Sequence, residues 1–149
     1  MPPRLTCGVL VTDGTHLLIA HATRTPRWDI PKGLANPDEP AIEAARRELR
    51  EETGLDAPTL IPPTLIPLGT HPYLRGKHLA LFAWQVPTMP DPAQLRCTSM
   101  VHRPNQAPFP ELDQFAVLPW DAALARLIPA MSRILAPIRA IIRPNLPTP

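Results

Sequence analysis

Residues 33–55 read GLANPDEPAIEAARRELREETGL, a stretch that contains six acidic residues and three arginines. Pro40 suits the start of a helix, because its missing N–H would have no partner there. Gly54 suits the position just past a helix end, where the backbone often turns left-handed. We therefore predict a helix over residues 40–53, preceded by a loop over residues 32–39.

Three glutamates of this helix fall on one edge. Successive helical residues rotate by about 100°, which brings Glu48, Glu51 and Glu52 together beside the apolar stripe of the helix. Carboxylates about 6 Å apart at an effective dielectric near 20 repel by roughly 3 kcal/mol per pair. A hard divalent cation resolves that conflict, because Mg²⁺ prefers carboxylate and phosphate oxygens. The simpler alternative is a solvated helix with Arg–Glu pairs, such as Arg47 with Glu51.

The same stretch resembles the signature of the Nudix hydrolases, G-x5-E-x7-R-E-U-x-E-E-x-G-U, where U is a bulky aliphatic residue. Every specified position matches: Gly33, Glu39, Arg47, Glu48, Leu49, Glu51, Glu52, Gly54 and Leu55. One free position differs from many members, since Asp38 stands where they have Gly. The resemblance implies an α+β fold, an α/β/α sandwich with a mixed sheet in which a loop-helix-loop motif follows an antiparallel hairpin.

The resemblance also implies a metal site and a reaction. Glu48, Glu51 and Glu52 would coordinate Mg²⁺ or Mn²⁺, with a backbone carbonyl from the Lys32-Gly33 turn as a further ligand. The bound ions would neutralise phosphate oxygens and generate a hydroxide that attacks phosphorus. Nudix enzymes use a general base from the signature or from a later loop.

The resemblance to the Nudix hydrolases also implies which residues act as general base and which position the glutamates. Glu48 is our first choice of general base, and Glu111 is the alternative. Arg47 would orient the glutamates, and Glu39 would pair with Arg47 or lie outside the metal ligands. These assignments stay predictions until the geometry is known.

Substrate contacts are predicted from residues 28–33, which read WDIPKG. They resemble the W-x-x-P-K-G lead-in of diadenosine polyphosphate hydrolases and some nucleotide-pool enzymes. Lys32 would contact a phosphate as a compact charge, next to Gly33. Tyr73, Arg75 and Lys77 would contact a base or further phosphates, unless they form only an exposed turn.

Apolar runs predict the rest of the sheet. Residues 5–12 and 15–21 flank Asp13-Gly14, a dipeptide typical of two-residue hairpin turns. Further strands are expected at residues 28–30, 65–71, 77–86, 95–101 and 115–118. Asp121 would cap a helix that runs to Ile128, and residues 131–142 would form another, with Ile134, Ile138 and Ile141 on one stripe and a kink or break at Pro137.

Length and composition favour one small domain. The chain has 149 residues with a net charge of +2, and we expect a single domain over residues 1–143 with a loose tail at 144–149. The basic residues form no run, which argues against DNA, and no segment is long and apolar enough for a membrane. Its two cysteines lie 90 positions apart (7 to 97), which favours a reduced, cytoplasmic protein.

The sequence therefore predicts a Mg²⁺-dependent pyrophosphohydrolase for a small nucleotide substrate. The best guess is a dinucleoside polyphosphate, a nucleoside diphosphate linked to another moiety. The alternatives are a nucleoside triphosphate, an RNA 5′ end, and a non-catalytic Nudix module that only binds nucleotide. The chain would be a monomer or a homodimer.

Overall fold

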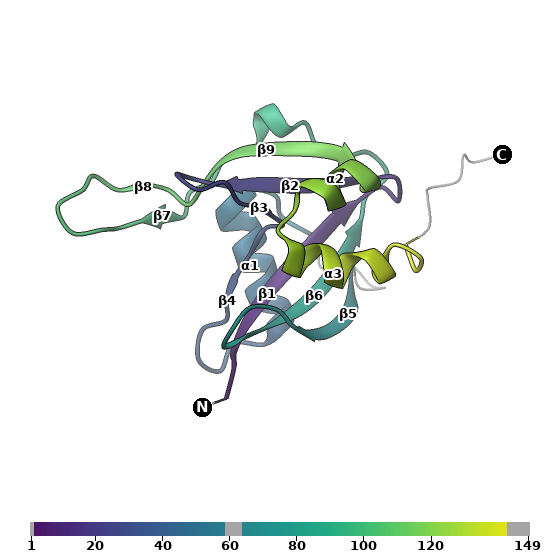
Figure 1. The fold of residues 1–149 in the computed structure, drawn as a ribbon, viewed down its shortest axis with the longest axis horizontal. Coiled ribbons are helices and arrows are strands. Elements are labelled where there is room, and N and C mark those ends of the chain that lie inside the picture. Colours follow the sequence, from purple (N-terminus) through teal and green to yellow (C-terminus); the bar gives the residue numbers. More distant parts are fainter. Residues whose placement is uncertain (1, 59–63, 143–149) are drawn as a thin grey trace.

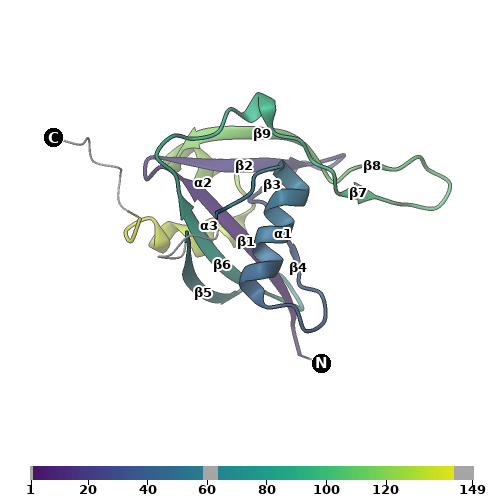
Figure 2. The same cartoon turned by 180° about the vertical axis from the view of Figure 1, so that it is seen from behind.

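The computed structural model describes residues 2–58 and 64–142. A mixed sheet lies between helix α1 on one face and helices α2 and α3 on the other (Figures 1 and 2). The elements are β1 Arg4–Thr12, β2 His16–Ala22, β3 Trp28–Asp29, β4 Lys32–Leu34, α1 Ala41–Thr53, β5 Leu65–Pro72, β6 Lys77–Gln85, a 3₁₀ turn Pro92–Gln94, β7 Met100–Val101, β8 Phe109–Pro110, β9 Leu112–Pro119, α2 Trp120–Arg126 and α3 Pro129–Ile138. The α+β sandwich expected from the resemblance is confirmed.

Strand β1 organises the sheet. It runs parallel to β6 along its whole length, while β4 pairs antiparallel with its first half and β2 with its end at Thr12. The strand order is β3-β2-β1-β6-β5, and β9 adds to β2. Strands β2 and β4 thus meet β1 at different places, and β4 also contacts α1.

Two apolar cores stabilise the sandwich. Alternate β1 residues such as Val9 and Leu10 point to opposite faces. Val9 packs with Leu49 of α1, whereas Leu10 packs with Met131 and Leu135 of α3, and all of these are fully buried. No helix in residues 2–58 or 64–142 is long and apolar enough to cross a membrane.

Helix α1 forms where the sequence predicts it. It starts at Ala41, because Pro40 has the extended ψ of 142° and is the N-cap. Gly54 ends it with a φ of 82°, the left-handed conformation that glycine adopts at low cost, and donates its N–H to Arg50.

The first hairpin is confirmed, but its turn is longer than the predicted two residues. The Asp13 carboxylate accepts the N–H groups of Thr15 and His16 at 2.9 and 2.7 Å. These bonds hold Thr15 in the turn, so that β2 begins at His16.

The predicted loop over residues 32–39 was wrong at its start. Lys32, Gly33 and Leu34 form strand β4 and pair with Gly8, Cys7 and Thr6 of β1. Three residues that include a glycine give no alternation from which a strand could be predicted.

The predicted strand at residues 95–101 was also largely wrong. The N–H groups of Arg96 and Thr98 donate to the carbonyls of Thr53 and Glu51, which ties this segment to the end of α1. Within this segment only Met100–Val101 forms a strand, and it pairs with Phe109–Pro110 in an arm that projects from the body (Figure 1).

The last strand is longer than predicted, since β9 covers Leu112–Pro119 and pairs with β2. Helix α2 has Pro119 as its N-cap, so Asp121 lies in its first turn instead of capping it. Helix α3 runs through Pro137 but ends at Ile138, so Ile141 lies outside the helix and is exposed instead of continuing the predicted stripe.

Candidate active site

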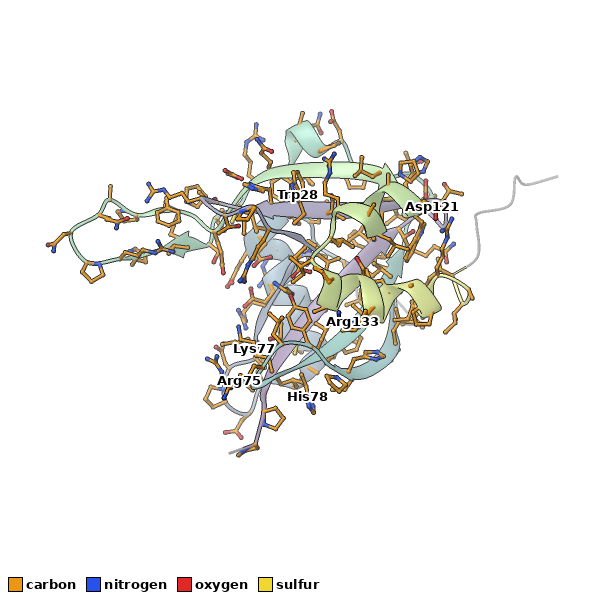
Figure 3. All side chains as sticks on the ribbon, viewed as in Figure 1. Trp28, Arg75, Lys77, His78, Asp121 and Arg133 are labelled. Carbon is orange, nitrogen blue, oxygen red and sulfur yellow. The ribbon has the colours of Figure 1, made fainter. Side chains whose placement is uncertain are left out.

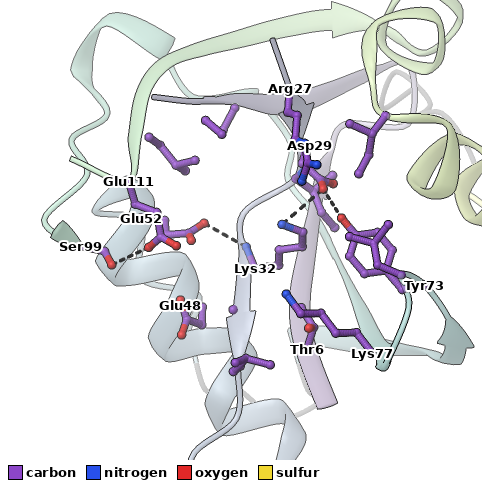
Figure 4. A pocket seen from close by; sticks show the side chains of 18 of the residues that line it. Thr6, Arg27, Asp29, Lys32, Glu48, Glu52, Tyr73, Lys77, Ser99 and Glu111 are labelled. Carbon is purple, nitrogen blue, oxygen red and sulfur yellow. Dashed lines mark hydrogen bonds and ion pairs between the residues drawn. The ribbon is translucent and has the colours of Figure 1, made fainter. Parts of the chain in front are cut away.

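A cavity of about 390 Å³ opens between α1, β4 and the β5–β6 turn. Its acidic wall carries Glu48 and Glu52 from α1 and Glu111 from the link between β8 and β9. Figure 4 shows these carboxylates facing Lys32 and the side chains beyond it. Glu48 and Glu52 thus share one pocket with Glu111, the alternative base, which lies 63 and 59 positions after them in the sequence (48 and 52 to 111).

Glu48 is held by the backbone of β4 and by its neighbour on α1. Gly33 leaves the space that the Glu48 carboxyl group occupies, because a Cβ at residue 33 would stand 2.1 Å from Glu48 Cδ. Arg47 Nη1 donates to Glu48 Oε1 at 2.8 Å. The pKa of Glu48 is raised, mainly because the carboxyl group is buried. The contact with Arg47 offsets part of this rise, and the nearby charges of Glu51 and Glu111 add to it.

Arg47 is the centre of a network that reaches the loop before α1. It donates to both Glu39 oxygens at 2.9 Å and to the carbonyl of Leu34 at 3.1 Å. The hydrogen bonds from Arg47 hold the pKa of Glu39 down to about 2. The pairing of Glu39 with Arg47, one of the two predicted arrangements, is the one observed.

Glu52 is the most deeply buried of the glutamates, at 3% exposure. The backbone N–H of Lys32 donates to its Oε2 at 3.0 Å. Burial holds the pKa of Glu52 well above its ordinary value, and Glu111 and Glu48 add to that rise. A positive charge bound beside Glu52 would therefore stabilise its ionised carboxylate.

Glu51 is more exposed than the other two predicted ligands, although it shares the Arg47 Nη1 contact with Glu48. Its side chain is 40% exposed and contacts Arg47 Nη1 at 3.2 Å, and it is not among the side chains that line the cavity. Its carbonyl accepts the N–H groups of Thr98 and Ser99, which anchors the start of the arm.

Glu111 enters the pocket from the arm. Ser99 Oγ donates to Glu111 Oε2 at 2.7 Å, and the N–H of Glu111 donates to the carbonyl of Ser99 at 2.8 Å. Ser99 was not predicted as a site residue, because only the pairing of β7 with β8 brings it to Glu111. The outcome is a fixed carboxylate beside the signature glutamates.

The opposite wall is basic. Lys32 Nζ lies 3.3 Å from Asp29 Oδ2, and the hydroxyl of Tyr73 donates to the same oxygen. Burial raises the pKa of Tyr73, and Asp29 raises it further, so Tyr73 stays a neutral donor. Asp29 was missed as a site residue although it lies within the quoted WDIPKG stretch.

Other basic side chains complete this wall. Arg27 and Lys77 line the cavity with Lys32 and Tyr73. Arg75 is exposed on the turn (Figure 3) and is not among the residues that line this cavity. The pocket therefore has Glu48, Glu52 and Glu111 on one side, and on the other cations with Asp29 among them.

The donor set fits a hard divalent cation, although the described residues contain no preformed group of three or more metal-binding side chains. Glu48 and Glu52 are buried carboxylates with raised pKa values, and both face Glu111. Oxygen ligands of this kind suit Mg²⁺, which completes its coordination with water and substrate phosphates. Glu48 and Glu52 are therefore the side chains best placed to hold it.

Comparison with known proteins identifies the family of this chain. The NUDIX domain family matches residues 2–136. The chain belongs to the NUDIX family. This Nudix hydrolase is 37% identical over 114 residues to an uncharacterized 17.7 kDa protein of Enterobacteria phage T4, covering 73% of this chain and 72% of that protein.

Two further similarities are more limited. An RNA pyrophosphohydrolase of Xanthomonas campestris is 45% identical over 47 residues, which is 32% of this chain and 23% of that protein. A C. elegans Ap4A hydrolase has the same fold, with a TM-score of 0.62 over 91% of this chain and 96% of that chain, at 18% identity. The second likeness concerns the fold alone.

Proposed function

We propose that this Nudix hydrolase is a Mg²⁺- or Mn²⁺-dependent pyrophosphohydrolase that cleaves a nucleoside diphosphate linked to another moiety. Our best candidate for the substrate is a dinucleoside polyphosphate. The observation that carries the proposal is the division of the pocket into an acidic wall with Glu48, Glu52 and Glu111 and a basic wall with Lys32 and Lys77. A phosphate chain needs both walls, since the cations bind its free oxygens while the carboxylates hold the metal.

The carboxylates have distinct roles in this proposal. Glu48 and Glu52 hold the metal from α1, with Glu51 as a further ligand and a carbonyl near Gly33 as another. A bound Mg²⁺ supplies charge neutralisation and an activated water. Glu48 would take the proton from the attacking water, and Glu111 is the alternative base because Ser99 fixes it in the same pocket.

Arg47 and Asp29 act as positioning residues. Arg47 contacts Glu48 and Glu51 on one side and Glu39 on the other, which fixes the carboxylates relative to the loop before α1. Asp29 holds the ammonium group of Lys32, so that its charge faces the substrate. Lys32 then binds the phosphate chain, and the ring of Tyr73, whose hydroxyl donates to Asp29, would contact the substrate beside it.

A second candidate, removal of pyrophosphate from RNA 5′ ends or from nucleoside triphosphates, is favoured by one observation. The stretch similar to the Xanthomonas campestris RNA pyrophosphohydrolase is 45% identical over 47 residues. The short length of that match leaves the dinucleotide as our first choice.

A substrate panel tests the proposal. Diadenosine tetraphosphate, ADP-ribose, nucleoside triphosphates and triphosphorylated RNA would be incubated with Mg²⁺ or with EDTA, and the products separated by chromatography. Metal-dependent release of ATP and AMP from the dinucleotide is the expected result. A preference for a triphosphate or RNA would replace the dinucleotide by the second candidate, and no turnover at all would favour a binding module.

A further inference from the structure

The basic wall holds a polar side chain that the proposed reaction does not use. Thr6 of β1 is 4% exposed and lines the same cavity as Lys32 and Lys77. Within the described part of the chain its hydroxyl has no hydrogen-bond partner. Buried polar groups normally have one, so an unpaired hydroxyl in a pocket indicates a bond made by a ligand.

The register of the sheet brings this hydroxyl close to Lys77. In the parallel pair of β1 and β6, Arg4 lies opposite Lys77, and Thr6 lies two residues further along on the same face. Figure 4 shows Thr6 beside Lys77 and below Lys32, on the side of the pocket away from Glu48. A hydroxyl and two ammonium groups therefore line one end of the cavity.

The charges at this end are not balanced. Among the described residues, Lys32 has an ion pair with Asp29, whereas Arg27 and Lys77 have none. Burial lowers the pKa of Lys77, and the neighbouring Arg4, Lys32 and Arg27 lower it further. A bound anion would relieve this repulsion and accept a hydrogen bond from the Thr6 hydroxyl.

We propose that Thr6, Lys32 and Lys77 form an oxyanion subsite, which binds a phosphate group at the end of the pocket opposite Glu48 and Glu52. Three observations support this subsite: the cavity, the unpaired hydroxyl of Thr6, and the two lysines that line the cavity beside it. Its assignment to a distal phosphate of the substrate, in place of free phosphate, rests on the proposed function.

Binding of inorganic tripolyphosphate tests the subsite without any turnover. The full chain is titrated with this ion by calorimetry in EDTA, so that metal does not contribute. Lys77→Gln and Thr6→Val should each weaken binding by about tenfold, the usual scale for a lost hydrogen bond to a charged group. Thr6→Ser keeps the hydroxyl and should bind like the wild type.

Arg75→Gln is the matched control, because it removes one positive charge from the same turn at an exposed position outside the cavity. It should weaken binding less than about twofold, as expected for a screened surface charge. Melting curves show whether Thr6→Val folds, and Lys77→Gln tests the subsite independently. Equal binding by wild type, Lys77→Gln and Thr6→Val, or an equal loss in Arg75→Gln, overturns the proposal.

Two further measurements, one of kinetics and one of binding, distinguish a phosphate of the substrate from free phosphate. If the subsite takes a distal phosphate of the substrate, Lys77→Gln raises KM for diadenosine tetraphosphate with Mg²⁺ and leaves kcat nearly unchanged. If it takes free phosphate, orthophosphate binds the wild type as tightly as tripolyphosphate does, and Lys77→Gln weakens both. Either result supports an oxyanion subsite, and a lack of hydrolysis would count only against the proposed function.

Discussion

The Cα of Gly33 lies against the carboxyl group of Glu48, so that a Cβ at residue 33 would stand 2.1 Å from Glu48 Cδ and 2.2 Å from its Oε2. Strand β4 thereby sets the position of a glutamate that belongs to α1. The contact explains why strand β4 needs glycine at this point: only hydrogen leaves room for the carboxyl group.

Gly33→Ala should therefore damage activity more than stability. The Glu48 carboxyl group is the end of a flexible side chain, so the fold can accommodate a methyl group by displacing it. We expect metal-dependent turnover to fall about 100-fold, as for other misplaced catalytic groups. A melting curve should change by only a few degrees. Unchanged turnover in a folded Gly33→Ala variant would show that this placement of Glu48 is not required.

Metal binding should offset repulsion among the buried carboxylates. Without metal, Glu52→Gln removes a buried charge that faces Glu48 and Glu111, so we expect the melting temperature to rise by about 3 °C, equivalent to roughly 1 kcal/mol. Millimolar Mg²⁺ should stabilise the wild type and have little effect on this variant. Glu43→Gln, at an exposed position on α1, is the control and should keep the full response to Mg²⁺. An equal response in Glu52→Gln would exclude Glu52 as a ligand.

The choice of general base can be tested at Glu111. If Glu48 is the base, Glu111→Gln should lower kcat by less than about tenfold, because a general base contributes typically 10²–10⁴-fold. The profile of kcat against pH, at saturating Mg²⁺, should keep the shape of the wild-type profile. A loss of 100-fold together with a lost acidic limb would assign the base to Glu111, and Ser99→Ala should then show a smaller loss in the same direction.

The Glu39–Arg47 pair should make stability depend on pH at the acidic end. Because hydrogen bonds from Arg47 hold the pKa of Glu39 down to about 2, its contribution is present above the ordinary value near 4.5 and is lost as the pH falls toward 2. Thermal melts should show Glu39→Gln less stable than the wild type at pH 6, with the difference shrinking by pH 3. A difference that stays constant over this range would mean that the charge of Glu39 does not contribute.

Much of this arrangement could be predicted from local sequence. Pro40 and Gly54 bound the helix, and the spacing of Glu48, Glu51 and Glu52 placed them on one edge, since helical periodicity depends only on neighbours along the chain. The first hairpin followed from Asp13-Gly14 in the same way.

What could not be predicted depends on pairing between distant segments. Strand β4 exists because its three residues pair with β1, and the segment after residue 94 is shaped by bonds to the end of α1. The contacts of Asp29 with Lys32 and of Ser99 with Glu111 arise only once these pairs form. Arg47 Nη1 joins Glu48 and Glu51, a contact that depends on a side-chain rotamer that no periodicity specifies.

Hydrolysis of diadenosine tetraphosphate by the wild type and by Glu52→Gln, with Mg²⁺ and with EDTA, tests the central claim most directly. We expect the wild type to release ATP and AMP only with Mg²⁺, and Glu52→Gln to be slower by about three orders of magnitude, equivalent to several kcal/mol of transition-state stabilisation. Undiminished turnover in EDTA, or a Glu52→Gln variant as active as the wild type, would contradict a metal-dependent reaction at this pocket.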